Sequence, residues 1–234
     1  MKTLLKEEKK LWQKGYEIVI GLDEVGRGAL AGPVVAVAFF VKRQFFLSNS
    51  QKIKIFFADW KKEVKNIIKD SKSLNSQKRE KLYRYFLNLK PEVEWGRGVV
   101  SEKIIDKINI LEATKLAMKR AIRSLERKIK KNFNQQNQDF LKNSFLIIDG
   151  NISLEDVLIP QKSIIKGDEK IFSCAAASII AKVERDRIMV NYNKKYSGYW
   201  FNKNKGYGTK KHLEMLKKKG PSEIHRQTFK PIRN

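Results

Sequence analysis

Residues 21–33 have the sequence GLDEVGRGALAGP, in which two adjacent carboxylates, Asp23 and Glu24, end an apolar run and a glycine-flanked arginine follows. The apolar residues 18–20 predict a buried strand, and acids at its end are costly unless a metal ion or another charge compensates them. The glycines of Gly26-Arg27-Gly28 leave backbone N–H groups open to an oxyanion of a ligand. Acids beside such a loop favour metal-assisted phosphoester chemistry.

Two strands flank this stretch, over residues 17–23 and 33–41, and the glycines between them allow a hairpin-like return. Apolar runs predict further strands over 93–101, 145–150 and 163–166, and helical spacing predicts helices over 76–88, 101–131 and 169–193. Strands followed by strands, then alternating with helices, favour a mixed α/β sheet covered by helices. Past residue 194 the composition becomes aromatic and basic, which indicates a terminal helical appendage.

The chain of 234 residues carries 50 Lys and Arg against 25 Asp and Glu, a formal net charge of +25. Solubility alone does not need such an excess, and its commonest use is to neutralise phosphates with release of counterions. A general enrichment in lysine and asparagine is a second explanation for part of the excess. Nucleic acid is therefore the expected partner.

A single cysteine, Cys174, excludes a disulfide framework and a cysteine-based zinc site, and it suits a reducing compartment. Two histidines, His212 and His225, are too few for an all-histidine metal centre. The charged residues 1–10 lack the apolar core of a signal peptide, and no apolar run is long enough to span a membrane. We expect a soluble, cytoplasmic protein that does not bind membranes.

Four acids follow apolar segments or strand-to-helix junctions instead of lying in charged surface runs: Asp23, Glu24, Asp149 and Asp168. Mg²⁺ is held by a few carboxylates together with substrate phosphate oxygens. Two such ions about 3.5–4 Å apart activate a water and stabilise the leaving oxygen, so that no histidine base is required. These acids are the candidate metal ligands and catalytic residues.

Each acid also has a structural alternative. An Asp followed by Gly, as at Asp149, is common in turns, and Asp168 is suited to cap a helix. Neighbouring strand residues point to opposite faces, so Asp23 and Glu24 share one site only if the strand ends or bulges there. A second Gly-Arg-Gly, at 96–98, has no acids beside it, and we interpret it as chance or packing.

Several motifs follow in register: GLDEVGRG at 21–28 with AGP at 31–33, DSKSL at 70–74, IDG at 148–150, KGD at 166–168 leading into AAASIIAKV at 175–183 and RDR at 185–187, and GYGT at 206–209. In order and spacing, over about residues 16–230, these motifs resemble bacterial ribonuclease HII, a type 2 ribonuclease H. Each motif alone is modest, but their joint order is highly specific.

The resemblance implies a ribonuclease H-like fold, a mixed five-stranded sheet flanked by helices with a small C-terminal helical region. It implies hydrolysis of the RNA strand of RNA-DNA hybrids, and cutting at single ribonucleotides in duplex DNA as in ribonucleotide excision repair, leaving 5′-phosphate and 3′-hydroxyl ends. The partners are then RNA-DNA hybrids and ribonucleotide-containing DNA. We expect the protein to be a monomer. Residues 1–193 would form the catalytic domain and residues 194–234 a substrate-binding appendage.

By motif position, the family's catalytic acids, which hold two Mg²⁺ or Mn²⁺ ions, correspond to Asp23, Glu24, Asp149 and Asp168. Asp23 would bridge the two ions. Gly26-Arg27-Gly28 resembles the loop that reads the 2′-hydroxyl, the group that distinguishes RNA from DNA locally. Tyr207 resembles the tyrosine that stacks on the neighbouring deoxyribose. Lys72 and Lys182 are candidate phosphate contacts, although any one of so many lysines is also explained as a solvated charge.

Residues 43–69 form a longer basic link than is usual in the family, and an extra element there would touch the duplex or pack on the sheet. The nearest alternative is ribonuclease HIII, which has the same general chemistry but usually carries an additional N-terminal domain and a different Gly-Arg-Gly loop. A non-catalytic basic RNA-binding protein would explain the charge and leave the four acids unexplained.

Overall fold

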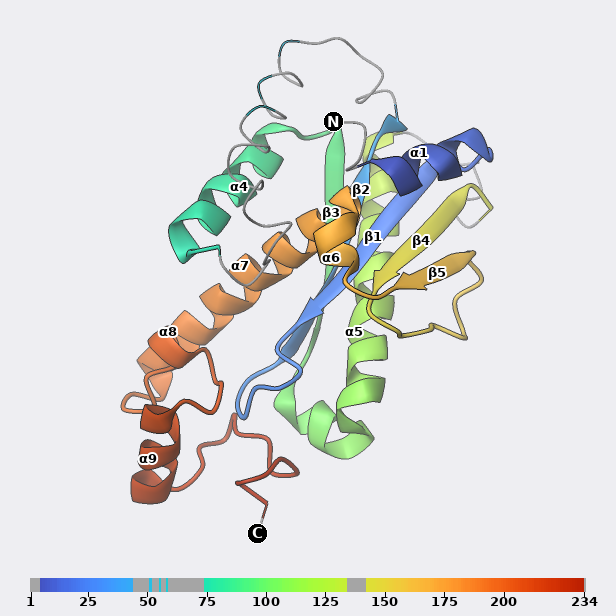
Figure 1. Cartoon of the computed structure of the whole chain (residues 1–234). Helices are drawn as coiled ribbons and strands as arrows, with labels where there is room; N and C mark the ends of the chain where they lie inside the picture. Colours follow the sequence, from blue (N-terminus) through green and yellow to red (C-terminus); the bar gives the residue numbers. More distant parts are fainter. Residues whose placement is uncertain are drawn as a thin grey trace.

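A five-stranded mixed sheet in the order β3-β2-β1-β4-β5 forms the centre of the protein (Figure 1). The computed structural model describes residues 5–43, 51, 55, 58, 74–133 and 142–233. The strands are β1 (Ile18–Val25), β2 (Val34–Val41), β3 (Val93–Val100), β4 (Ser144–Asp149) and β5 (Gln161–Ile164). β2 is antiparallel to β1 and β3, whereas β4 is parallel to β1 and β5. The predicted mixed sheet is confirmed, with its last strand slightly earlier than expected.

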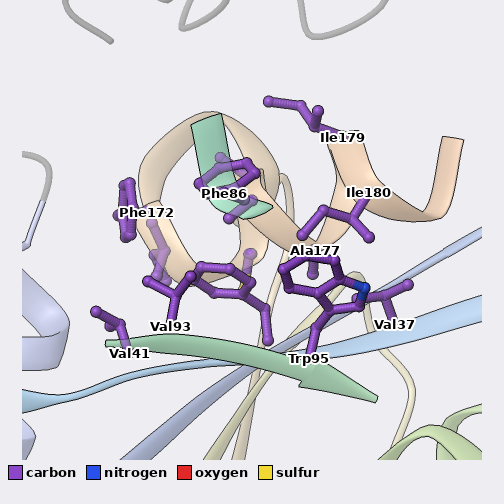
Figure 2. Close-up of a cluster of buried hydrophobic side chains, with 14 of the residues drawn as sticks. Val37, Val41, Phe86, Val93, Trp95, Phe172, Ala177, Ile179 and Ile180 are labelled. Atoms are coloured by element: carbon purple, nitrogen blue, oxygen red, sulfur yellow. The ribbon is translucent and has the colours of Figure 1, made fainter. Parts of the chain in front are cut away.

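Helices cover both faces of this sheet, because side chains alternate along its strands. Val19 and Phe39 face α4 (Ser76–Asn88) and α7 (Phe172–Lys195) in one apolar cluster. Ile20 and Leu22 face α5 (Glu102–Phe133) in the other. Figure 2 shows the first cluster, in which Trp95 points from β3 toward the side chains of α7.

The second Gly-Arg-Gly, at 96–98, serves packing between β3 and α5. A Cβ atom on Gly96 would lie 2.1 Å from the carbonyl oxygen of Ala121, and one on Gly98 would lie 1.9 Å from that of Ala117. Both distances are far below van der Waals contact, so only glycine lets α5 approach the strand this closely. Of the two explanations considered from the sequence, packing is therefore confirmed.

The helix predicted over 101–131 is interrupted at Asn109, which has a φ of 67°. Its side-chain oxygen accepts hydrogen bonds from the backbone N–H groups of Leu111 (2.9 Å) and Glu112 (3.1 Å). Asparagine tolerates positive φ and caps the helix that follows. The long helix is therefore two helical segments joined by a capped turn.

The helix predicted over 169–193 is also divided, into α6 (Gly167–Lys170) and α7, with the extended residue Ile171 between them. The second segment is capped from a distant element, because Glu8 of α1 (Lys6–Gln13) reaches its first turn. The Oε1 atom of Glu8 accepts from the backbone N–H (2.9 Å) and hydroxyl (3.0 Å) of Ser173. Glu8 is fully buried, and its Oε2 has no partner among the residues described.

Glu8 makes the stability of the fold depend on pH. Burial raises its pKa from 4.5 to about 7, against the hydrogen bonds from Ser173. A carboxyl whose pKa is raised by folding contributes stability that is full below 4.5 and is lost as the pH rises through 7. Denaturant titrations should show Glu8 lowering the free energy of unfolding by about 1.4 kcal/mol between pH 6 and pH 8. Glu8→Gln should lack this component, and equal pH slopes in both proteins would contradict the prediction.

The C-terminal region contains α8 (Phe201–Asn204) and α9 (Lys210–Lys219), followed by a segment without helix that runs to residue 233. Figure 1 shows this region and the β1–β2 connection at the same end of the molecule. A small apolar cluster joins Ala31 of that connection and Met189 of α7 to Tyr199, Phe201 and Ile224. The predicted helical appendage is thus present and packs on the glycine-rich loop, while its role as a separate domain stays a prediction.

Two sequence predictions fall on residues outside the described ranges. These are the role of most of the long link at 43–69 and the phosphate contact assigned to Lys72. Within the described ranges, no helix is long and apolar enough to cross a membrane.

Candidate active site

A cleft of about 680 Å³ opens where the parallel strands β1 and β4 end. It brings together every site residue predicted from the sequence that lies within the described ranges. Its lining consists of Asp23, Glu24, Val25, Gly26, Arg27, Gly28, Arg79, Asp149, Asp168, Ala175, Ser178, Ile179, Lys182 and Tyr207. The acids and the glycine-rich loop therefore border one continuous space.

Asp23 and Glu24 share this cleft although β1 neither ends nor bulges between them, so that expectation was wrong. β1 pairs regularly with β2 as far as Val25, while its pairing with β4 stops at Leu22. By alternation Asp23 faces α7 and Glu24 faces the opposite side of the sheet. The early end of β4 opens the edge of β1 here, so side chains on both faces reach the same cleft.

Burial and mutual repulsion disfavour ionisation of three of the acids, Asp23, Glu24 and Asp149. Asp23 is only 6% exposed, and its pKa is raised well above the usual value by burial and then by Glu24 and Asp149, against a hydrogen bond from Ser178. Burial likewise raises the pKa of Glu24, against the attraction of Arg27, whose Nη1 lies 3.2 Å from its Oε1. A cation placed among these carboxylates would relieve the repulsion.

Asp149 and Asp168 are joined through the start of α6. The Oδ1 atom of Asp149, the last residue of β4, accepts a hydrogen bond from the backbone N–H of Gly167 at 2.6 Å. Burial and the nearby Asp168 raise the pKa of Asp149. The helix-cap alternative for Asp168 is wrong, because Lys166 occupies the N-cap position of α6. Asp149 holds the turn that brings Asp168 to the cleft.

The donor chemistry of the cleft fits a hard divalent cation. Among the residues described, no three Asp, Glu, His or Cys side chains form a complete metal cage. Mg²⁺ needs only a few carboxylates when substrate phosphate oxygens supply further ligands. Four acidic side chains that border one space, three of them with raised pKa values, suit an ion whose coordination is completed by substrate.

The opposite wall of the cleft is aromatic and basic. Tyr207 follows Gly206, which has a φ of 85°, and its ring centre lies 5.7 Å from the Nζ of Lys182. That Nζ donates to Asp186 at 2.8 Å, and Asp186 lies 3.7 Å from Arg79. Lys182 is therefore a paired residue of the cleft wall and not a freely solvated charge.

Comparison with known proteins identifies the family. A model described as Ribonuclease HII matches residues 20–232. The chain belongs to the ribonuclease HII family. The ribonuclease HII of Caldanaerobacter subterraneus subsp. tengcongensis is 44% identical over 95% of this chain and 78% of its own length. That of Dehalococcoides mccartyi is 41% identical over 97% of this chain and 93% of its own length.

Membership of the ribonuclease HII family makes this chain a ribonuclease H, a hydrolase acting on RNA-DNA hybrids. The predicted family is confirmed, and the alternative of a non-catalytic RNA-binding protein is wrong. The family is also metal-dependent, in agreement with the acid-lined cleft.

Solved structures agree with the ribonuclease H fold. The ribonuclease H2 of Pyrococcus horikoshii OT3 matches with a TM-score of 0.61 and 24% identity over 92% of this chain and 95% of that chain. Bst-RNase HIII in complex with Mn²⁺ matches with a TM-score of 0.62 and 19% identity over 95% of this chain and 70% of that chain. These likenesses show the fold alone, and the family match favours ribonuclease HII over ribonuclease HIII.

Sequence reasoning missed two residues of the ribonuclease HII cleft. Ser178 hydrogen-bonds Asp23, but in the sequence it is one residue of the run AAASIIAKV at 175–183, with no local pattern that marks it as part of a site. Arg79 lines the cleft, yet nothing distinguishes it in sequence from the other cations of a basic helix. The roles of Ser178 and Arg79 become visible only in the fold, where α7 and α4 lie beside the end of β1.

Proposed function

We propose that this protein hydrolyses the RNA strand of RNA-DNA hybrids and also cuts at single ribonucleotides embedded in duplex DNA, leaving 5′-phosphate and 3′-hydroxyl ends. The observation that carries the proposal is one cleft bordered by four acids, the Gly26-Arg27-Gly28 loop and Tyr207. Such a site combines groups for phosphoester hydrolysis with groups that contact a sugar.

We assign the holding of two Mg²⁺ or Mn²⁺ ions to Asp23, Glu24, Asp149 and Asp168. When bound, such ions supply an activated water and stabilise charge on the leaving oxygen. Asp23 is the most buried of the four and interacts with the other three, which suits a bridging position. The similar Bst-RNase HIII structure is a complex with Mn²⁺.

The substrate contacts divide between the loop and the opposite wall. We assign recognition of the 2′-hydroxyl to Gly26-Arg27-Gly28, because a Cβ added at Gly28 meets no protein atom within 4 Å and a sugar can approach the backbone closely. Tyr207 presents a ring to the adjoining deoxyribose. Lys182, and Lys72 by its motif, would contact phosphates.

The C-terminal region 194–234 supplies Tyr207 and packs against the loop, which supports its assignment as a substrate-binding appendage to a catalytic domain at 1–193. The buried, unpaired Cys174 is compatible with a reducing cytoplasm. We propose that the protein acts there as a monomer.

The test is a cleavage assay on three duplexes of the same sequence: an RNA-DNA hybrid, DNA with one ribonucleotide, and DNA alone. We expect cutting of the first two with Mg²⁺ or Mn²⁺, none with EDTA, and 5′-phosphate ends by mass spectrometry. Binding of the single-ribonucleotide duplex without cleavage in either metal would overturn the proposal.

A further inference from the structure

Arg226 is buried to 0% exposure in the segment after α9, and its guanidinium contacts the glycine-rich loop. Its Nη2 donates to the carbonyl oxygen of Gly26 at 2.7 Å, and its Nη1 donates to that of Arg27 at 2.8 Å. Its Nε donates to the carbonyl of Gly32 at 3.0 Å. One side chain therefore joins both ends of the loop through backbone acceptors.

The backbone around Arg226 reinforces this contact. Its own N–H donates to the carbonyl of Leu30 at 2.9 Å, and the N–H of Gly32 donates to Ile224 at 2.8 Å. Between these bonds, Ala31 and His225 form an antiparallel bridge. The loop is thus held by backbone hydrogen bonds to residues 224–226 and, in addition, by the side-chain hydrogen bonds of the Arg226 guanidinium.

The direction of two carbonyls fixes the direction of two amides. The peptide bonds of the loop are trans, so each carbonyl and the N–H of the next residue point in opposite directions. Because the carbonyls of Gly26 and Arg27 point to Arg226, the N–H groups of Arg27 and Gly28 point away from it. No hydrogen bond from either amide is found within the described part of the chain.

We propose that Arg226 is a positioning residue for ribonucleotide recognition, which orients the peptide planes of the loop so that the amides of Arg27 and Gly28 face the 2′-hydroxyl. This inference rests on the proposed function of that loop. Arg226 does not touch substrate and acts through the backbone that it holds.

An arginine is required because a single planar guanidinium donates hydrogen bonds to three carbonyl oxygens. A lysine ammonium at this position is a point charge on a flexible stem and does not span the same acceptors. Burial lowers the pKa of Arg226 to about 9, which still leaves it charged at neutral pH. No carboxylate of the described residues forms an ion pair with Arg226. The carbonyl oxygens of the loop therefore stabilise its buried positive charge.

The same segment also holds the backbone of Tyr207. The Nδ1 of His225 accepts from the N–H of Ser222 (2.8 Å), so its proton lies on Nε2 and is donated to the Nε2 of His212 at 3.0 Å. His212 then donates from Nδ1 to the carbonyl of Tyr207 at 2.8 Å. Both groups assigned to sugar recognition are therefore fixed by one stretch of chain.

The experiment compares the wild type with Arg226→Lys and Arg226→Gln. Two quantities are measured: the KM for cleavage of DNA that carries one ribonucleotide, and the Ki of the same duplex of DNA alone as a competitive inhibitor of that cleavage. The ratio of Ki to KM is the preference for the ribonucleotide. We expect each variant that melts cooperatively to lose about 10- to 100-fold of this preference, the range known for residues that orient metal ligands through hydrogen bonds. Asp106→Ala is the matched control, since Asp106 anchors the adjoining residues Gln227 and Thr228 to α5 without touching the loop. It should keep the preference.

A second measurement needs no variant. In EDTA, the amide NMR signals of Arg27 and Gly28 in the wild type should shift with the single-ribonucleotide duplex and not with the DNA duplex. A folded Arg226 variant with wild-type preference, an equal loss in Asp106→Ala, or unmoved amides would overturn the inference alone. Failure of the wild type to cut the ribonucleotide duplex would overturn the proposed function as well.

Discussion

Asp23→Asn is expected to abolish cleavage on both ribonucleotide-containing substrates. The substitution keeps the size of the side chain and an oxygen that can accept from the N–H of Glu24, a bond of 2.7 Å in the wild type. It removes the negative charge at the centre of the acids, and with it the preferred ligand of a hard cation. We expect kcat to fall on the order of 10³-fold or more, equivalent to about 4 kcal/mol, in single-turnover assays with Mg²⁺.

The same change should stabilise the metal-free protein. The pKa of Asp23 is raised by folding, so its contribution to stability is full below its unfolded pKa and is lost as the pH rises through the folded value. At pH 8 in EDTA, above the unfolded pKa, burying this carboxyl is a cost to folding that asparagine lacks. The melting temperature should rise by about 2–4 °C for each kcal/mol gained. Asp156→Asn, at an exposed ion pair with Lys119, is the control and should change neither property. A less stable Asp23→Asn, or one with activity near that of the wild type, would contradict the assignment.

Gly28→Ala is expected to inactivate the enzyme without unfolding it. A Cβ at residue 28 meets no protein atom within 4 Å, and its φ lies outside the positive range that strains other residues. The added methyl group would instead occupy the space through which we expect the sugar to approach the loop. We expect unchanged melting and a loss of about 100-fold in kcat/KM on the single-ribonucleotide duplex, the scale of a 1 Å misplacement.

Gly26→Ala provides the contrast, because the protein itself requires that glycine. Gly26 has a φ of 95°, and a Cβ there would lie 2.2 Å from the Nε of Arg185. We expect this variant to lose about 2 kcal/mol or more of stability. Equal effects of the two alanines on melting, or full activity in Gly28→Ala, would remove the reason for placing the ribonucleotide at this loop.

The acids could be predicted from the sequence because a charge at the end of a buried strand is conspicuous and its spacing is local. Their shared cleft could not be derived in the same way. The expectation that the strand ends or bulges at Glu24 considered β1 alone, whereas the space is made by the early end of β4 beside Leu22. Strand length relative to a neighbour is a property of the sheet and has no local pattern.

Long-range hydrogen bonds to backbone explain what else escaped prediction. The start of α7 depends on Glu8, which lies 165 residues before Ser173 in the chain. Arg226 lies 200 residues after Gly26, and its acceptors are carbonyls that every residue type carries. The sequence around Glu8 and Arg226 does not differ from that around a charged residue on the surface. Their roles become visible only because the structure shows both side chains buried.

The contact between Arg226 and the loop orders events during synthesis of the chain. The last of the four acids, Asp168, is translated well before Arg226, whereas a domain folds as a unit. A nascent chain of that length holds every proposed metal ligand but lacks the guanidinium that orients the loop at residues 26–28. On the proposed roles, every metal ligand is therefore translated before the residue that orients the ribonucleotide-reading loop, which is added with the final stretch of translation.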